Sequence, residues 1–92
     1  FCDPGEGGRF AASGATHLGG ALPINSSGGL ISRGHPIAAS GLAMVNELVT
    51  QLREEAGKRQ VEKARIGMIE NGGGMIGFEE AACVVSILER NN

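Results

Sequence analysis

Apolar residues in the middle of the chain recur at three- and four-residue intervals, the spacing of one face of an α-helix. This pattern predicts a helix over residues 36–55. Gly57 is expected to end it, because glycine readily adopts the left-handed conformation that closes many helices. The apolar stripe consists of Leu42, Val45, Leu48, Val49 and Leu52.

Two shorter apolar runs predict strands over residues 64–70 and 83–88, the second rich in β-branched side chains. The glycine-rich residues 71–77 between them are expected to form a flexible loop without regular structure. A strand, a loop and a strand in this order favour an antiparallel hairpin, with the helix covering one of its faces. A short strand over residues 21–24 is also expected. The predicted fold class is therefore α/β.

The first 22 residues alternate glycine, alanine, serine and charged residues without a period, so an irregular segment is expected there. The chain has 92 residues, of which sixteen are glycine and three are aromatic. So short a chain buries little apolar surface, and glycine raises the entropy lost on folding. We therefore expect the chain to be incomplete on its own and to be a fragment of a larger domain.

The formal net charge is −2, with both signs interspersed. This pattern argues against a nucleic-acid partner or an anionic membrane surface, and no apolar run reaches the length of a membrane span. A small molecule or another protein is the expected partner. The charged residues 54–63 and the pair Glu79 and Glu80 are expected to be solvated faces.

The two cysteines, Cys2 and Cys83, lie at opposite ends of the chain without metal-type spacing. No disulfide scaffold and no zinc site is expected. Neither cysteine has a basic neighbour that would favour a thiolate, so neither is expected to be a nucleophile, and Cys83 is expected to be a small buried apolar side chain. A reducing compartment, the cytoplasm, is expected, and the C-terminus carries no peroxisomal tripeptide.

His35 stands between Gly34 and Pro36, where the loop is expected to pass into the helix. Glycine permits a sharp turn, proline suits the first turn of a helix, and an imidazole can exchange a proton near neutral pH. A backbone carbonyl could equally satisfy this ring at the start of a helix, but the setting favours function. His17 lacks such a setting and is expected to be solvated, so a two-histidine metal site has little support.

Glu70 ends the first predicted strand beside the triple glycine. A partly desolvated carboxylate there could act as a general base, whereas a solvated strand-end residue is the simpler interpretation. Gly72, Gly74 and Gly77 satisfy the spacing G-x-G-x-x-G, but no helix, further strand and acidic residue follow as a dinucleotide site requires. A glycine loop whose backbone N–H groups line a cavity is the preferred interpretation.

Taken together, these motifs resemble the C-terminal part of the thiolase family, in particular thiolases similar to the sterol-carrier-protein type. The resemblance covers nearly the whole chain. The block Gly34-His35-Pro36, at its spacing from Gly28-Gly29, is the specific part. The remaining matching motifs are Pro23-Ile24-Asn25, Ser40-Gly41 and Gly72-Gly73-Gly74.

The resemblance implies the layered α/β/α fold of thiolases and a two-step acyl transfer between acyl-CoA units through a cysteine thioester. It implies that His35 activates the nucleophile and donates a hydrogen bond to the thioester oxygen, and that the Gly72 N–H helps to form a second oxyanion hole. Coenzyme A thioesters would be substrates, and no cofactor is implied. The nucleophilic cysteine of the family lies in an N-terminal half outside these residues, so this chain alone is expected to be inactive. A homo-oligomer of the full-length protein is implied.

Two positions depart from the family pattern. Glu70 stands where thiolases place a second, acid–base cysteine, so it is either a variant base or a sign of changed chemistry. Ala38 stands where the family has glycine, so either the backbone there is ordinary right-handed helix or the pocket is narrower. These departures leave a second hypothesis open, a non-catalytic thiolase-like domain that binds acyl-CoA, lipid or a partner subunit.

Overall fold

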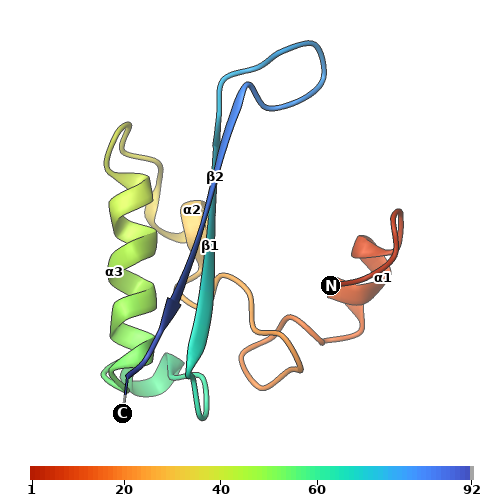
Figure 1. Ribbon diagram of the computed structural model, residues 1–92. Helices are drawn as coiled ribbons and strands as arrows, with labels where there is room; N and C mark the ends of the chain where they lie inside the picture. The colour runs from red at the N-terminus through yellow and green to blue at the C-terminus, as the bar shows by residue number, and fades with distance from the viewer. Residues whose placement is uncertain (92) are drawn as a thin grey trace.

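The computed structural model describes residues 1–91. A helix lies along one face of a two-stranded hairpin, and a short N-terminal helix stands apart from both (Figure 1). This arrangement confirms the predicted α/β fold of a helix on an antiparallel hairpin. The elements are α1 (Gly7–Ala12), α2 (Gly29–Arg33), α3 (Ser40–Leu52), the 3-10 turn η1 (Gly57–Arg59), β1 (Ile66–Gly73) and β2 (Ala82–Glu89).

The strands β1 and β2 pair antiparallel, with Glu70 opposite Val85 and Asn71 opposite Val84. Because side chains alternate along a strand and directly opposed residues share a face, neighbouring residues of β1 face opposite ways. The face toward α3 carries Gly67, Ile69, Asn71, Val84, Ser86 and Leu88, and the outer face carries Ile66, Met68, Glu70, Gly72, Cys83, Val85 and Ile87.

The predicted flexible loop is shorter than expected. Residues 71–73 belong to β1 and pair with β2, so their assignment to an irregular loop was wrong. Each of these residues lies opposite a partner on β2, and the hydrogen bonds of the ladder offset the entropy that glycine loses in a strand. The residues between the strands extend the hairpin as a long loop beyond the N-terminal start of α3 (Figure 1).

The small core lies where α3 crosses the hairpin. Leu52, Ala56 and Ile69 are buried, and the Leu48 side chain fills the space beside Gly67, where a Cβ atom would not fit. Toward the start of α3 the predicted apolar stripe is uncovered, since Leu42 is 72% exposed. The chain therefore leaves part of its apolar stripe unburied.

The helix α3 is shorter at both ends than the predicted range 36–55. Residues 36–39 form a turn, because Ala38 adopts the left-handed φ of 64° and interrupts the helical backbone. At the other end the helix is closed by Glu54, whose φ is 63°, and not by Gly57, which also has a positive φ of 58° but lies three residues further on, at the start of η1. The N–H of Glu55 donates to the Thr50 carbonyl at 3.0 Å and the N–H of Glu54 donates to the Gln51 carbonyl at 3.1 Å, which is the Schellman closure.

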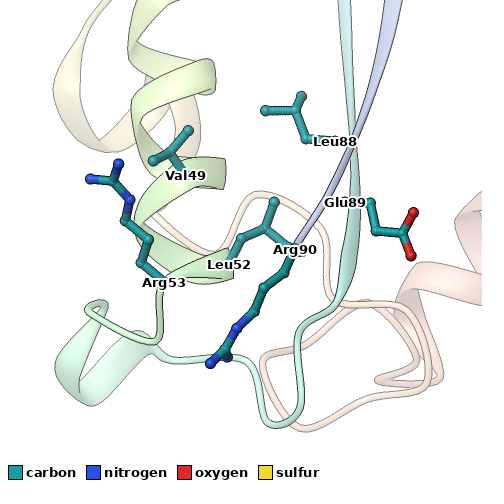
Figure 2. Close-up of a pocket in the computed structure, with 6 residues that line it drawn as sticks. All are labelled: Val49, Leu52, Arg53, Leu88, Glu89 and Arg90. Carbon is teal, nitrogen blue, oxygen red and sulfur yellow. The ribbon is translucent and has the colours of Figure 1, made fainter. Parts of the chain in front are cut away.

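An ion pair and a shallow hollow lie at this end of α3. Glu54 pairs with Arg90, which follows β2, at 2.7 Å. The hollow has a volume of ≈ 290 Å³, and Leu88 points toward α3 there whereas Glu89 points away (Figure 2). Glu54 belongs to the run 54–63 that was expected to be solvated, and it is exposed as well as paired.

The N-terminal third differs from expectation in three places. Residues 21–24 form no strand. The segment expected to be irregular contains α1, and the loop before His35 contains α2. Both helices are too short to show a helical period in the sequence. Gly28 and Gly34, with φ of 87° and 80°, flank α2 and allow the chain to enter and leave so short a helix.

Candidate active site

The imidazole of His35 is held by the first residue of α3. His35 Nδ1 lies 2.7 Å from the Ser40 hydroxyl oxygen, and Ser40 is only 5% exposed. Gly34, with a φ of 80°, turns the chain just before the histidine. The N–H groups of Ala39 and Ser40 both donate to the Pro36 carbonyl, which closes the turn between the histidine and the helix. The ring therefore has a fixed partner on its Nδ1 side.

Ala38 stands where the family has glycine, and two explanations were open: an ordinary right-handed helical backbone at this residue, or a narrower pocket. Its φ of 64° excludes ordinary right-handed helix at this residue. A left-handed conformation costs an alanine roughly 1–2 kcal/mol, because Cβ approaches the following carbonyl oxygen. The Ala38 side chain also lines the hollow beside His35, where it takes up space that a glycine would leave free.

An open hollow of ≈ 390 Å³ lies between the start of α3 and the hairpin, with His35 among its lining residues. Its polar groups come from His35, Ser40, Asn71 and Ser86. Its apolar wall is formed by Leu42, Val45, Ile69 and Val84, together with the small residues Ala38 and Gly41. A mostly apolar wall with a few polar groups is the usual make-up of a ligand site.

Asn71 supplies the side chain of β1 that meets the start of α3. A methyl group on Gly41 would lie 2.8 Å from the Asn71 side-chain nitrogen, so the two residues are in close contact. The strand alternation that turns Asn71 toward α3 turns Glu70 away from it. The residue of β1 that faces the His35 hollow is therefore Asn71, and the structure does not bring Glu70 beside His35.

The carboxylate of Glu70 instead lies on the outer face of the hairpin, where the Cys83 thiol donates to Glu70 Oε1 at 3.3 Å. Cys83 is exposed, so its expected burial was wrong. Its hydrogen bond to Glu70 raises the pKa of the Cys83 thiol, and partial desolvation by the neighbouring side chains and the negative charges of Glu70 and Glu80 act in the same direction. A thiol held in its protonated form is a poor nucleophile.

Gly72 lies on this same outer face, directly opposite Cys83. The Glu80 carboxyl group covers its Cα atom and leaves no room for a Cβ. Glu80 was expected to be solvated, and it is exposed while resting on Gly72. The ligand atoms of Glu70, Glu80 and Cys83 lie within 4.8 Å of one another, and among residues 1–91 this exposed group is the one cluster of three His, Cys, Asp or Glu side chains at the spacing of metal ligands.

A second network fixes the loop that leads to α2. The Glu47 carboxylate accepts hydrogen bonds from Arg59 at 2.9 Å and from Ser26 at 3.4 Å, and the buried Gln51 amide donates to both Glu47 and Ser26. The hydrogen bond from Arg59 is the largest of the effects that hold the pKa of Glu47 below its ordinary value, against a smaller opposing effect of burial. Arg59 is exposed, as expected of this charged run, and it supports the loop before His35 through Glu47.

Two lining residues of the hollow, Ser40 and Asn71, were not singled out as functional from the sequence. The spacing of Ser40 four residues after Pro36, at a helix start, was the available signal for Ser40. Because side chains alternate along a strand, the sequence indicates that Glu70 and Asn71 face opposite ways. It does not indicate which of the two faces the helix. His17, expected to be solvated, is exposed.

None of the helices formed by residues 1–91 is both long enough and apolar enough to cross a membrane.

The chain matches the family described as Thiolase C-terminal domain-like over residues 1–90. The resemblance deduced from the Gly-His-Pro block and the glycine motifs is thereby confirmed.

Three curated relatives illustrate the similarity. The acetyl-CoA acetyltransferase of Methanothermobacter thermautotrophicus is 57% identical over 74 residues, which cover 80% of this chain and 19% of the relative. Sterol carrier protein 2 of Bos taurus is 47% identical over 91 residues, covering 89% of this chain and 17% of the relative. The benzoylsuccinyl-CoA thiolase subunit BbsB of Thauera aromatica is 43% identical over 75 residues, covering 80% and 20%. The chain thus spans about a fifth of these relatives or less.

Proposed function

The chain belongs to the thiolase family by its match to the C-terminal domain-like group, and on that premise we propose that it is the catalytic C-terminal portion of an acetyl-CoA C-acyltransferase. The reaction would form or cleave a carbon–carbon bond between acyl-CoA units through a cysteine thioester. Coenzyme A thioesters are the substrates in this proposal, without a bound cofactor. The nucleophilic cysteine would come from an N-terminal thiolase half, so residues 1–92 alone would be inactive.

One observation carries the proposal: the His35 ring is held by the nearly buried hydroxyl of Ser40 and lines the hollow between α3 and the hairpin. Because Nδ1 is engaged by Ser40, Nε2 is the ring atom left for a substrate. In the proposal His35 accepts the proton of the nucleophilic cysteine and donates a hydrogen bond to the thioester oxygen of the enolate-forming acyl-CoA. A donor aimed at developing negative charge lowers the barrier by several kcal/mol.

The backbone N–H of Gly72 and the carboxylate of Glu70 complete the proposed machinery. Gly72 would donate to the carbonyl oxygen of the acyl-enzyme, and the Glu80 carboxyl over its Cα would have to leave when that group arrives. Glu70 would exchange a proton in place of the acid–base cysteine of the family. Glu70 faces away from His35, so it would exchange its proton from the outer face of the hairpin.

The proposal is tested in a hybrid enzyme, in which this chain replaces the homologous C-terminal segment of the Methanothermobacter acetyl-CoA acetyltransferase. The hybrid should cleave acetoacetyl-CoA. Substitution His35→Ala should lower kcat by about 10²–10⁴-fold, the usual contribution of an acid–base group. His17→Ala, which removes the other, exposed histidine, is the matched control and should keep wild-type turnover. Equal turnover of the two variants would remove the assigned role.

The same hybrid tests Glu70. If its carboxylate exchanges the catalytic proton, Glu70→Gln should lower kcat while Glu70→Cys retains activity. A large gain in thiolysis with Glu70→Cys would instead mean that the native carboxylate is unsuited to this chemistry. Glu79→Gln, a nearby exposed carboxylate outside the cluster around Cys83, is the control for a general change of charge.

A second candidate function is a non-catalytic domain that binds acyl-CoA, lipid or a partner subunit. The position of Glu70 on the face away from His35 favours it, as does the similarity to a relative named sterol carrier protein 2. Calorimetry would support this function over the enzymatic one if an acyl-CoA binds to a hybrid that has no turnover. Titration with NAD or ATP should give no heat in either case.

The organisation proposed for the chain follows from these roles. Residues 1–24 would be the N-terminal segment, predicted to be irregular, residues 25–57 would carry the Gly-His-Pro loop and the helix, and residues 64–90 would carry the strand, glycine loop and strand. In the full-length protein α3 would be covered by further layers of the thiolase fold, which its uncovered Leu42 supports. Assembly into a homo-oligomer and a cytoplasmic location complete the proposal.

A further inference from the structure

The hydroxyl of Ser40 touches two acceptors but has one proton to give. Its oxygen lies 2.7 Å from His35 Nδ1 and 3.3 Å from the carbonyl oxygen of Pro36. If the Ser40 hydroxyl donates to the Pro36 carbonyl, its oxygen must accept a hydrogen bond from Nδ1–H of His35. If it donates to His35 instead, Nδ1 carries no proton and is the acceptor. The direction of this one hydrogen bond therefore decides which ring nitrogen of a neutral His35 carries the proton.

The surroundings of Pro36 favour donation to the histidine. The Pro36 carbonyl already accepts two backbone N–H groups, from Ala39 and Ser40, each at 3.1 Å. Two donors match the two lone pairs of a carbonyl oxygen. The hydroxyl is a third and more distant donor there, whereas its 2.7 Å separation from Nδ1 is that of a strong hydrogen bond. Because Ser40 is 5% exposed, water competes little for the hydroxyl.

We propose that Ser40 is a positioning residue that donates to Nδ1 and keeps the proton of the neutral His35 on Nε2. The inference rests on the proposed function, in which the Nε2–H group of His35 donates a hydrogen bond to the thioester oxygen of the substrate. The step in which His35 accepts a proton needs the other tautomer. To reach it, the Nε2 proton leaves to solvent and a solvent proton adds to Nδ1, while the Ser40 hydroxyl rotates toward Pro36 and accepts from the new Nδ1–H.

Nuclear magnetic resonance of the hybrid enzyme labelled with ¹⁵N-histidine tests the tautomer directly. The His35 signals are assigned by their absence from His35→Gln. In alkaline buffer the wild type should show an unprotonated Nδ1 and a protonated Nε2, and Ser40→Ala should shift toward a mixture of tautomers. A proton-bearing Nδ1 in the wild type, or identical signals in the wild type and Ser40→Ala, would overturn the inference.

Kinetics of the hybrid give the second readout. Ser40→Ala should lower kcat about tenfold, the effect expected of one hydrogen bond, with little change in KM. Ser40→Thr keeps the hydroxyl and should recover most of the rate. The control is Thr50→Ala, which removes a hydroxyl that donates to a carbonyl four residues back on the same helix, at 2.8 Å, without touching His35. A Ser40→Ala hybrid as fast as the Thr50→Ala hybrid counts against the inference.

The two proposals fail in different ways. If His35→Ala keeps full turnover, the enzymatic role falls, while the ¹⁵N signals still decide the direction of the Ser40 hydrogen bond. If His35→Ala loses turnover and Ser40→Ala does not, the enzymatic role stands and the positioning role of Ser40 falls.

Discussion

The side-chain amide of Asn71 lies against the Cα atom of Gly41, where a methyl group would stand 2.8 Å from the amide nitrogen. This contact joins β1 to the first turn of α3 at the edge of the His35 hollow. It explains why a helix position that would ordinarily prefer alanine holds glycine, and it can be measured as a coupling between the two residues.

Gly41→Ala alone should change stability little. Alanine in a helix is favoured over glycine by about 1 kcal/mol, but the new methyl group must displace the end of the Asn71 side chain. In a chain that already carries Asn71→Ala, the same substitution should give the full helical gain. Urea unfolding of the four hybrids forms a double-mutant cycle. Equal effects of Gly41→Ala in both backgrounds would show that the contact is energetically neutral.

Ala38→Gly should stabilise the protein. The left-handed φ of 64° strains alanine, and glycine removes a strain of about 1–2 kcal/mol while adding a smaller entropy cost, for a net gain of about 0.5–1 kcal/mol. Ala39→Gly is the matched control. Its φ of −107° is allowed to alanine, so that substitution should destabilise. Thermal unfolding compares them, and a loss of stability with Ala38→Gly would contradict the strain.

Glu47 should make stability depend on pH in the acid range. Its hydrogen bond from Arg59 lowers the folded-state pKa below the ordinary value of 4.5, so the unfolded chain binds more protons between the two values. The stabilisation is complete above the ordinary value and is lost as the pH falls through the folded one. Glu47→Gln should flatten the decline in urea midpoints below pH 4.5.

The matched control for Glu47 is Glu62→Gln, which removes an exposed carboxylate that makes no hydrogen bond or ion pair within residues 1–91. This variant should keep the acid decline of the wild type. An equally steep decline in Glu47→Gln would mean that the Arg59 contact contributes nothing to the folded state.

Cys83 should react slowly with alkylating agents, because its hydrogen bond to Glu70 and the nearby carboxylates raise its pKa above the ordinary 9.0. Glu70→Gln removes the nearest negative charge, lowers that pKa and should speed alkylation by iodoacetamide near neutral pH. Cys2→Ser in every variant leaves Cys83 as the only cysteine of these residues. Glu79→Gln serves as the control, and a rate unchanged by Glu70→Gln would argue against the thiol–carboxylate contact.

The sequence predicted the parts of the fold that repeat over several residues. The spacing of the stripe from Leu42 to Leu52 was enough to identify α3, and two β-rich runs around glycines were enough to identify the hairpin. The helix ends were harder. Neither Ala38 nor Glu54 is a residue type that favours a left-handed backbone, so the turns that they form left no signal in the sequence.

The Gly-His-Pro block identified His35 and the thiolase family from the sequence alone, because a histidine between those two residues at a helix start is an uncommon combination. Only the tertiary structure decided which side chains lie beside that histidine. One step along β1 exchanges Glu70 for Asn71 beside the hollow, since adjacent side chains of a strand face opposite ways. The turn at Ala38 sets Ser40 against the ring. Local patterns determine elements, whereas the contacts of a site depend on how those elements meet in space.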